Sequence, residues 1–142
     1  MTNETTFTMK PIGYVYTDAA DIPRHWSISD VEGRIVINPE YEAGLCNIEA
    51  GQRIVVLFCF HESPAFQDHL LRQTPPHRDI PLGVFSICSP RRPNPIGLSV
   101  VEVLAVNGGE IHVKGIDMLD QTPVLDLKPH IEDRHNCHST DG

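Results

Sequence analysis

Two short stretches of the sequence hold residue types from which a polar binding site is built. The first, "SPRRPNPIGLS" (residues 89–99), packs three prolines, two arginines, an asparagine and a glycine between two apolar runs. Each proline fixes its own φ and biases the residue before it toward an extended backbone, so Arg92 and Asn94 are both held extended. Gly97 permits a close backbone approach before the next run. The pattern alone fits a rigid strand connection with solvated arginines as well as it fits a binding loop.

The second stretch is "GIDMLDQTPVLDLKPH" (residues 115–130), which sets Asp117, Asp120 and Asp126 close to a Thr-Pro turn. Carboxylates on a loop accept hydrogen bonds from ribose hydroxyls or from an amine, and a prolyl turn holds them in place. For each aspartate taken singly, capping of a turn by its side chain is the alternative interpretation.

The elements that position these stretches are predicted to be mainly β. Short runs rich in Val and Ile, separated by Pro, Gly and Asn, are typical of strands. We expect strands at Lys10–Thr17, Gly33–Asn38, Arg53–His61, Gly83–Cys88, Leu98–Val106 and Glu110–Ile116. The many short strands favour a small closed or nearly closed β-barrel, in which Arg53–His61 is apolar enough to be buried on both faces.

Few other elements are expected. Only Pro39–Leu45 and Pro64–Leu71 have the pattern of short helices, and Asn107–Gly109 is predicted to form a tight hairpin turn. The polar, proline-rich segment Leu70–Pro81 is predicted to be a surface loop. With 142 residues the chain is predicted to form one domain, residues 1–142, which ends in a polar tail at 130–142.

Charge and cysteine content limit the class of protein. The net charge of -8 argues against a protein that holds nucleic acid mainly by neutralising phosphates. A local basic strip at Arg72, Arg78 and Arg91 remains compatible with contacts to an RNA loop, or with a solvated surface loop. No segment has the order of a secretory signal or the roughly 20 apolar residues of a membrane span. Four cysteines without a C-x-x-C pair predict reduced thiols and a cytoplasmic location.

A metal site is not expected. Histidines and a cysteine crowd the tail, but a zinc site needs about four ligands that converge on ordered backbone. No G-x-S-x-G motif surrounds Ser89 or Ser99, so nucleophilic hydrolysis is not indicated either.

Together the two stretches resemble a known family. "SPRRPNPIGLSVVEVL" and "GIDMLDQTPVLDLKPH", with "NPEYEAGL" and "VLFCFHES" upstream, are similar to the TsaA-like (TrmO) S-adenosylmethionine-dependent methyltransferases. The resemblance covers about residues 11–129, the predicted core. It implies a small β-barrel enzyme, typically a homodimer. It also implies S-adenosyl-L-methionine as the cofactor and the exocyclic amine of N6-threonylcarbamoyladenosine, beside the anticodon of threonine tRNA, as the acceptor.

The resemblance also implies site residues. The residues carried over as catalytic are Asn94, Asp120 and Asp126. Those carried over as cofactor-binding, on two facing walls, are Arg92, Pro95, Ile96, Gly97, Ser99, Asp117, Leu119, Thr122, Lys128 and, nearby, His61. Arg72, Arg78 and Arg91 are the candidate RNA contacts.

Two positions depart from the family pattern. Cys88 and Leu82 stand where family members commonly carry arginine, which lowers the positive charge near the expected substrate entrance. Two alternatives therefore stay beside the tRNA methyltransferase: a barrel of the same family with a different acceptor, and a noncatalytic sensor or binding module that keeps the cofactor pocket.

Overall fold

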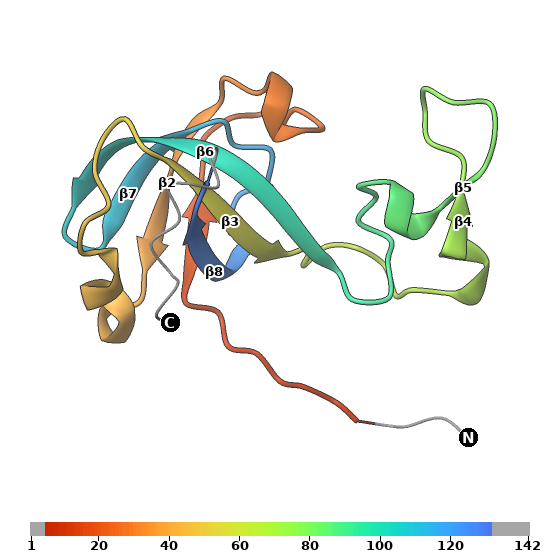
Figure 1. The fold of residues 1–142 in the computed structure, drawn as a ribbon, viewed down its shortest axis with the longest axis horizontal. Coiled ribbons are helices and arrows are strands. Elements are labelled where there is room, and N and C mark those ends of the chain that lie inside the picture. The colour runs from red at the N-terminus through yellow and green to blue at the C-terminus, as the bar shows by residue number, and fades with distance from the viewer. Residues whose placement is uncertain (1–4, 132–142) are drawn as a thin grey trace.

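The structure is a computed structural model that describes residues 5–131 of the chain. It contains short strands and 3-10 helices (Figure 1). The strands are β1 (Gly13–Tyr16), β2 (Glu32–Ile37), β3 (Arg53–Cys59), β4 (Arg72–Gln73), β5 (Leu82–Gly83), β6 (Ile96–Asn107), β7 (Glu110–Lys114) and β8 (Pro123–Pro129). The 3-10 helices are η1 (Trp26–Ile28), η2 (Pro39–Leu45), η3 (Asp68–Leu71) and η4 (Val84–Ser86).

Six of these strands close into a barrel in the order β1-β2-β7-β6-β3-β8, and every neighbouring pair is antiparallel. Closure pairs both edges of the sheet, which removes exposed strand edges. The predicted barrel is therefore confirmed. Its interior is filled by β-branched and other apolar side chains, with Val15, Ile35, Val56, Val103 and Ile111 among the fully buried ones.

Alternation along β3 shows which side of the wall faces the core. Ile54, Val56 and Phe58 are buried, whereas the residues between them are only half-buried. The prediction that this segment is buried on both faces is therefore wrong for the single chain. The apolar outer side of β3 is only partly covered.

Three local predictions are also corrected. Gly83–Cys88 is not a strand, because only the two residues of β5 pair and Val84–Ser86 turns into η4. Pro39–Leu45 and the end of Pro64–Leu71 are helical, but both are 3-10 helices, and the second begins only at Asp68. The stretch 123–129 is strand β8 rather than part of a loop, because Pro123 opens the strand, where its missing N–H is tolerated.

The antiparallel order decides where the loops lie. Strands β1, β3 and β7 all run in one direction, so their carboxyl ends meet at the same end of the barrel. Three connections leave from there: the β1–β2 loop (residues 17–31), the long excursion between β3 and β6 (residues 60–95), and the β7–β8 loop (residues 115–122). We call this end the mouth. The opposite end carries η2 and the tight β6–β7 turn.

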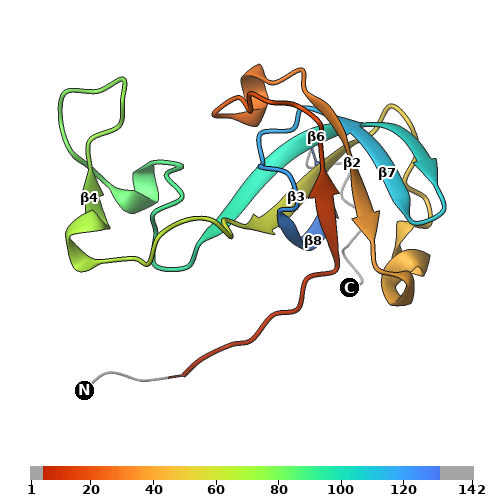
Figure 2. The same ribbon diagram turned by 180° about the vertical axis from the view of Figure 1, so that it is seen from behind.

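The excursion of residues 60–95 forms an arm that projects from the barrel, and Figures 1 and 2 show it standing clear of the barrel from both sides. It contains the two-stranded sheet β4–β5. The amino-terminal segment before β1 also extends away from the barrel (Figure 1). Within residues 5–131, no helix has the length and apolar character needed to span a membrane.

Candidate active site

The proline-rich loop at the base of the arm is held by its own polar groups. Arg92 Nη1 donates hydrogen bonds to the carbonyl oxygens of Ile87 at 2.9 Å and Ser89 at 3.0 Å. The Ser89 hydroxyl oxygen in turn accepts from the backbone N–H of Arg91 at 3.1 Å. Part of the Arg92 guanidinium is thus committed to folding the loop, which the sequence did not reveal. The remaining guanidinium donors are compatible with an anionic ligand.

The following residues join this loop to the barrel. Asn94 O accepts from Ile96 N at 2.7 Å, and Pro95 O accepts from Phe60 N at 2.8 Å, so the backbone turns sharply into β6. The Asn94 side chain is exposed at the mouth. Gly97 comes next and is buried, and a Cβ built there would lie 2.3 Å from Phe58 Cζ. Glycine is required at that position because two strand-end phenylalanines close over it.

The opposite wall of the mouth is the β7–β8 loop. Ser99, fully buried on β6, donates its hydroxyl to Asp117 Oδ1. The backbone N–H of Trp26 also bonds this carboxylate. Burial raises the pKa of Asp117 above its usual value, and the hydrogen bond from Ser99, the nearby His25 and the Trp26 bond each oppose that rise. The carboxylate is therefore largely occupied by protein partners.

Asp120 and its neighbours complete this wall. Asp120 Oδ1 accepts from the backbone N–H of Thr17 at 2.9 Å, and Thr122 Oγ1 donates to Leu119 O at 2.6 Å. The Thr122 side chain is buried and stabilises the turn, whereas Leu119 remains 47% exposed. Ile96 and Leu98 of β6 are likewise 39% and 53% exposed, so the mouth offers apolar surface beside its polar groups.

Asp126 and Lys128 lie on strand β8 rather than on the loop before it. Both are on β8 and pair in register with Leu57 and Val55 of β3, and Leu57 pairs on its other side with Leu98 of β6, so Asp126 lies in the same row of the barrel wall as Leu98. Their side chains form an ion pair at 3.0 Å, and Asp126 Oδ1 accepts from Leu127 N at 2.9 Å. The sequence missed this strand because the polar residues of β8 suggest a loop.

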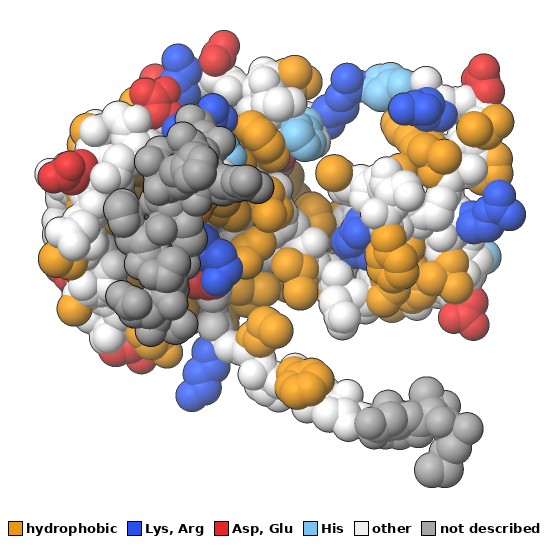
Figure 3. Space-filling model, viewed as in Figure 1, with side chains coloured by type: hydrophobic (Ala, Val, Ile, Leu, Met, Phe, Trp, Pro, Cys, Tyr) orange, Lys and Arg blue, Asp and Glu red, His pale blue; other side chains and the backbone are white. Residues whose placement is uncertain are grey.

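The remaining predicted residues lie at the mouth or on the arm. His61 lies two residues after the end of β3, and its Nε2 lies 3.4 Å from Glu62 Oε2. Arg72 lies on β4, Arg91 at the arm base and Arg78 in the loop between β4 and β5, and all three are exposed. Figure 3 shows basic and apolar side chains gathered on the arm.

The structure adds the β1–β2 loop, which carries none of the predicted site residues. Its Arg24 contacts His77 of the arm, and its Trp26 lies beside Asp117. The sequence gives little indication that this loop belongs to the site, because only the direction and order of the strands show that the three loops leave from the same end of the barrel.

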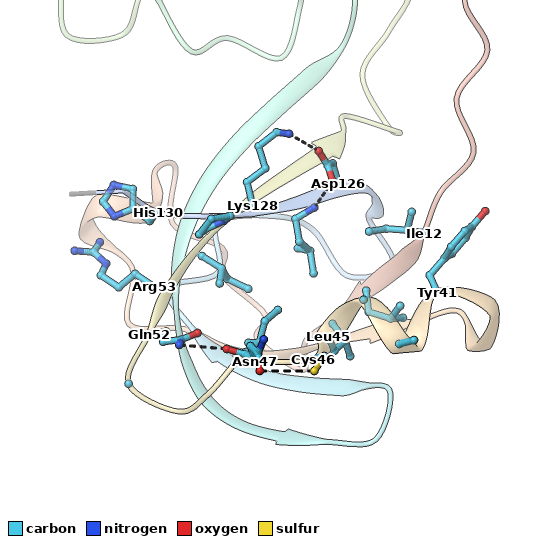
Figure 4. A pocket seen from close by; sticks show the side chains of 18 of the residues that line it. Ile12, Tyr41, Leu45, Cys46, Asn47, Gln52, Arg53, Asp126, Lys128 and His130 are labelled. Carbon is cyan, nitrogen blue, oxygen red and sulfur yellow. Dashed lines mark hydrogen bonds and ion pairs between the residues drawn. The ribbon is translucent and has the colours of Figure 1, made fainter. Parts of the chain in front are cut away.

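A separate cavity of about 1010 Å³ lies at the opposite end of the barrel. Figure 4 shows Leu45, Cys46, Asn47 and Gln52 on one side of it and the Asp126–Lys128 pair on the other. Its floor is apolar, with Ile12, Ile37, Leu45, Ile54 and Leu127 among the lining residues.

Metal chemistry has no structural support in the part of the chain that the structure describes. Residues 5–131 contain no group of three His, Cys, Asp or Glu side chains placed to hold a metal ion. The histidines and the cysteine of the tail, apart from His130, lie outside the described residues. Cys46, Cys59 and Cys88 are free thiols.

The fold and the mouth define a small closed β-barrel that carries its polar loops at one end, the arrangement in which such barrels bind ligands. The chain belongs to the family described as "tRNA-methyltransferase O N-terminal domain", which matches residues 12–135. The resemblance to the TsaA-like (TrmO) family is thus confirmed.

Individual relatives agree with this membership. An "S-adenosyl-L-methionine-binding protein" of Archaeoglobus fulgidus is 42% identical over 125 residues, which are 86% of this chain and 88% of that protein. A human "tRNA (adenine(37)-N6)-methyltransferase" is 36% identical over 132 residues, but these are only 30% of its length and 86% of this chain.

Solved structures of TrmO have a similar fold. A crystal structure of TrmO superposes with a TM-score of 0.74 at 31% identity, and covers 94% of this chain and 62% of that one. TrmO from Pseudomonas aeruginosa gives 0.72 at 29% identity, over 94% and 60% of the two chains. This chain therefore spans under two thirds of the solved TrmO chains and about a third of the human relative.

Proposed function

We propose that this protein is an S-adenosylmethionine-dependent methyltransferase that acts on the exocyclic amine of N6-threonylcarbamoyladenosine beside the anticodon of tRNA. The observation that carries the proposal is that the Asn94 loop leads directly into β6, whose buried Ser99 hydroxyl donates a hydrogen bond to Asp117 of the β7–β8 loop. Relatives named as tRNA methyltransferases and as S-adenosylmethionine-binding proteins support it.

The residues at the mouth fit such a cofactor. S-adenosylmethionine combines a cationic sulfonium, an amine, a carboxylate, a ribose and a purine, so its site needs acidic groups, a cation and apolar surface. Asp120 supplies a carboxylate, and the exposed Ile96, Leu98 and Leu119 supply apolar surface. When bound, the cofactor supplies an electrophilic methyl group whose departure leaves a neutral thioether.

The role of the protein is then positioning and charge. The acceptor nitrogen is a weak nucleophile that becomes positive as it attacks, and oxygen acceptors aimed at its protons stabilise that charge. Asn94, set between two prolines, presents its side-chain oxygen from a fixed backbone. Asp120, at the facing wall, receives the proton that the nitrogen loses. A rigid frame serves this chemistry because transfer rewards a near-attack geometry of about 3 to 3.5 Å.

The arm supports an RNA acceptor and a second copy of the chain. Residues 60–95 carry four arginines and three acidic residues, a net charge of +1 in a chain of net charge -8. RNA is expected to approach along this face.

The arm also exposes apolar side chains. Leu71, Ile80 and Phe85 are 47%, 59% and 79% exposed, which is more apolar surface than a monomer usually presents on a projecting element. We propose that a homodimer covers it, together with the outer side of β3. Light scattering of the purified protein tests this.

A labelled-methyl assay tests the activity. Purified protein is incubated with radiolabelled S-adenosylmethionine and tRNA, with or without prior threonylcarbamoylation. The proposal expects label only in the modified tRNA and a loss of about 10² to 10³ in rate for Asn94→Ala. Asn107→Ala, at the opposite end of the barrel, is the matched control and should keep the rate. Label in unmodified tRNA alone would contradict the proposed acceptor.

The second candidate is a binding module without transfer. Relatives aligned over most of their length, including the Archaeoglobus protein, are named only for S-adenosylmethionine binding. Calorimetric binding of S-adenosylmethionine together with no transfer to any tRNA would favour this candidate, whereas turnover would exclude it.

A further inference from the structure

The cavity beside η2 lies where β8 continues past the strand next to it. In the described part of the chain, β8 pairs with β1 only through its first two residues, opposite Tyr14 and Gly13, and then runs on to Pro129. The cavity of about 1010 Å³ is lined by residues 126–130, just beyond this short ladder, and by Ile12, the residue before β1. It therefore occupies the space that a continuation of β1 toward the amino terminus would cover.

The walls of this cavity suit apolar side chains. Ile37, Leu45 and Ile54 of the barrel core contribute to its lining. Figure 4 shows Ile12 and Tyr41 on the same side of the cavity, and Tyr41 is 40% exposed. An apolar occupant would remove this surface from water.

The backbone of β8 offers little to a further strand. The N–H of Leu127 is bonded to Asp126 Oδ1 at 2.9 Å, and Pro129 has no N–H. Contacts in the cavity must therefore come mainly from side chains rather than from an added ladder of hydrogen bonds.

The amino-terminal segment, residues 5–12, has the matching pattern. Its sequence "TTFTMKPI" alternates threonine with Phe7 and Met9, the period of a strand with one apolar face. Phe7 and Met9 are 81% and 61% exposed. Counted back in steps of two from Val15 and Gly13, which are both buried in β1, they fall on the face of the strand that points inward.

This segment leaves the barrel in a fixed direction. Asn38 donates from its backbone N–H to Ile12 O at 2.8 Å and from Nδ2 to Pro11 O at 3.2 Å. Pro11 also biases Lys10 toward an extended backbone. Figures 1 and 2 show the segment leading away from the barrel and from η2, which forms one wall of the cavity. It is thus directed toward a neighbouring molecule rather than back over its own cavity.

We propose that residues 5–10 of one copy of the chain dock in this cavity of a second copy, with Phe7 and Met9 packed against Tyr41 and the apolar floor. When both copies exchange their segments about a twofold axis, the contact closes and is made twice. This exchange goes beyond the proposed function and does not depend on it. It is also a different contact from the exposed surface of the arm.

The first test introduces one charge on either face of the segment and follows the dimer by analytical ultracentrifugation over a range of concentrations. Met9→Asp should raise the dissociation constant of the dimer about 10-fold or more, because the exchange would bury an unpaired carboxylate. Thr8→Asp adds the same charge on the opposite face and should leave the constant unchanged. Phe85→Asp, on the arm, reports the other proposed contact.

Two outcomes of this test would overturn the exchange. One is a wild type that stays monomeric at every concentration. The other is a dimer that Phe85→Asp dissociates and Met9→Asp leaves intact, which would assign the contact to the arm alone.

The second test identifies the occupant with the natural thiol of Cys46, which is exposed and lines the cavity. Thr6→Cys places a second thiol beside Phe7 without removing either apolar side chain. A short bismaleimide should then link two chains, and the linked dimer should be lost when Cys46→Ser is added. A link from position 6 to Cys46 within one chain would show that the segment covers its own cavity, and no link to Cys46 would exclude docking there; either result overturns the exchange. Neither test requires S-adenosylmethionine or tRNA, so the exchange and the proposed function fail independently.

Discussion

The hydroxyl of Ser99, fully buried on β6, donates a hydrogen bond to the carboxylate of Asp117 on the β7–β8 loop. This bond ties the loop to the barrel interior and brings a carboxylate out of water. Because burial outweighs the hydrogen bonds, the pKa of Asp117 is raised. The same group that stabilises the mouth therefore makes the stability of the barrel depend on pH.

The first prediction concerns this pH dependence. A carboxyl group with a raised pKa binds its proton more tightly in the folded protein, so its favourable contribution is fully present below the unfolded value near 3.8 and is lost as pH rises through the folded pKa. Asp117→Asn cannot titrate. The free energy of unfolding of the wild type minus that of Asp117→Asn should therefore fall as pH rises above about 4. Urea titrations at several pH values between about 4 and 8 measure it, and a difference that rises with pH would contradict the assignment.

Gly97 gives a second prediction. An alanine there would set its Cβ 2.3 Å from Phe58 Cζ and 2.8 Å from Phe60 Cζ, and these two rings already pack edge to face at 5.1 Å. Overpacking of this kind costs about 1 to 3 kcal/mol. Gly83→Ala is the matched control, because no atom would lie within 4 Å of a Cβ at that position and its φ of -63° suits any residue. Thermal or urea unfolding should separate the two variants clearly, and equal stability would show that the phenylalanines move aside.

The third prediction addresses Arg92. Arg92→Ala removes the donor that joins the carbonyl oxygens of Ile87 and Ser89, so amide exchange in residues 87–95 should become faster. Arg91→Ala removes a neighbouring exposed side chain of equal charge and should leave that exchange unchanged. Exchange followed by mass spectrometry compares them. If both variants exchange alike, the two carbonyl contacts do not hold the loop.

Local sequence features predict the barrel well, because period-two alternation and turn residues act over a few positions. Strands β1, β2, β3, β6 and β7 follow from Val- and Ile-rich runs, and Asn107-Gly108-Gly109 marks the hairpin between the last two. The exception is β8, whose Asp126 and Lys128 are polar residues on an outer wall and so hide the pattern. A strand with this composition can be recognised only when its pairing with β1 and β3 is known.

The candidate site is predictable only in part for the same reason. Asn94 and Asp120 stand out as residue types beside prolines, and strand direction then brings their loops to one mouth. The roles of Ser99 and Asp117 as partners of each other depend on two residues 18 positions apart meeting across the barrel wall. The contact between Arg24 and His77 escapes sequence reasoning because the two residues lie 53 positions apart in two polar loops.

The last prediction decides which carboxylate takes the proton. Asp120 lies on the β7–β8 loop and accepts from the Thr17 N–H, whereas Asp126 lies on the outer wall of β8 in an ion pair with Lys128. Asp120→Asn keeps an oxygen for the Thr17 N–H but removes the base, so the rate of methyl transfer at saturating cofactor should fall about 10² to 10⁴-fold. Asp126→Asn breaks only an exposed ion pair, which is worth about 1 kcal/mol or less, and should leave the rate within a few-fold of the wild type. Single-turnover rates with saturating cofactor measure both. The reverse ranking would place the reacting nitrogen against the β8 wall and move the active site away from the mouth.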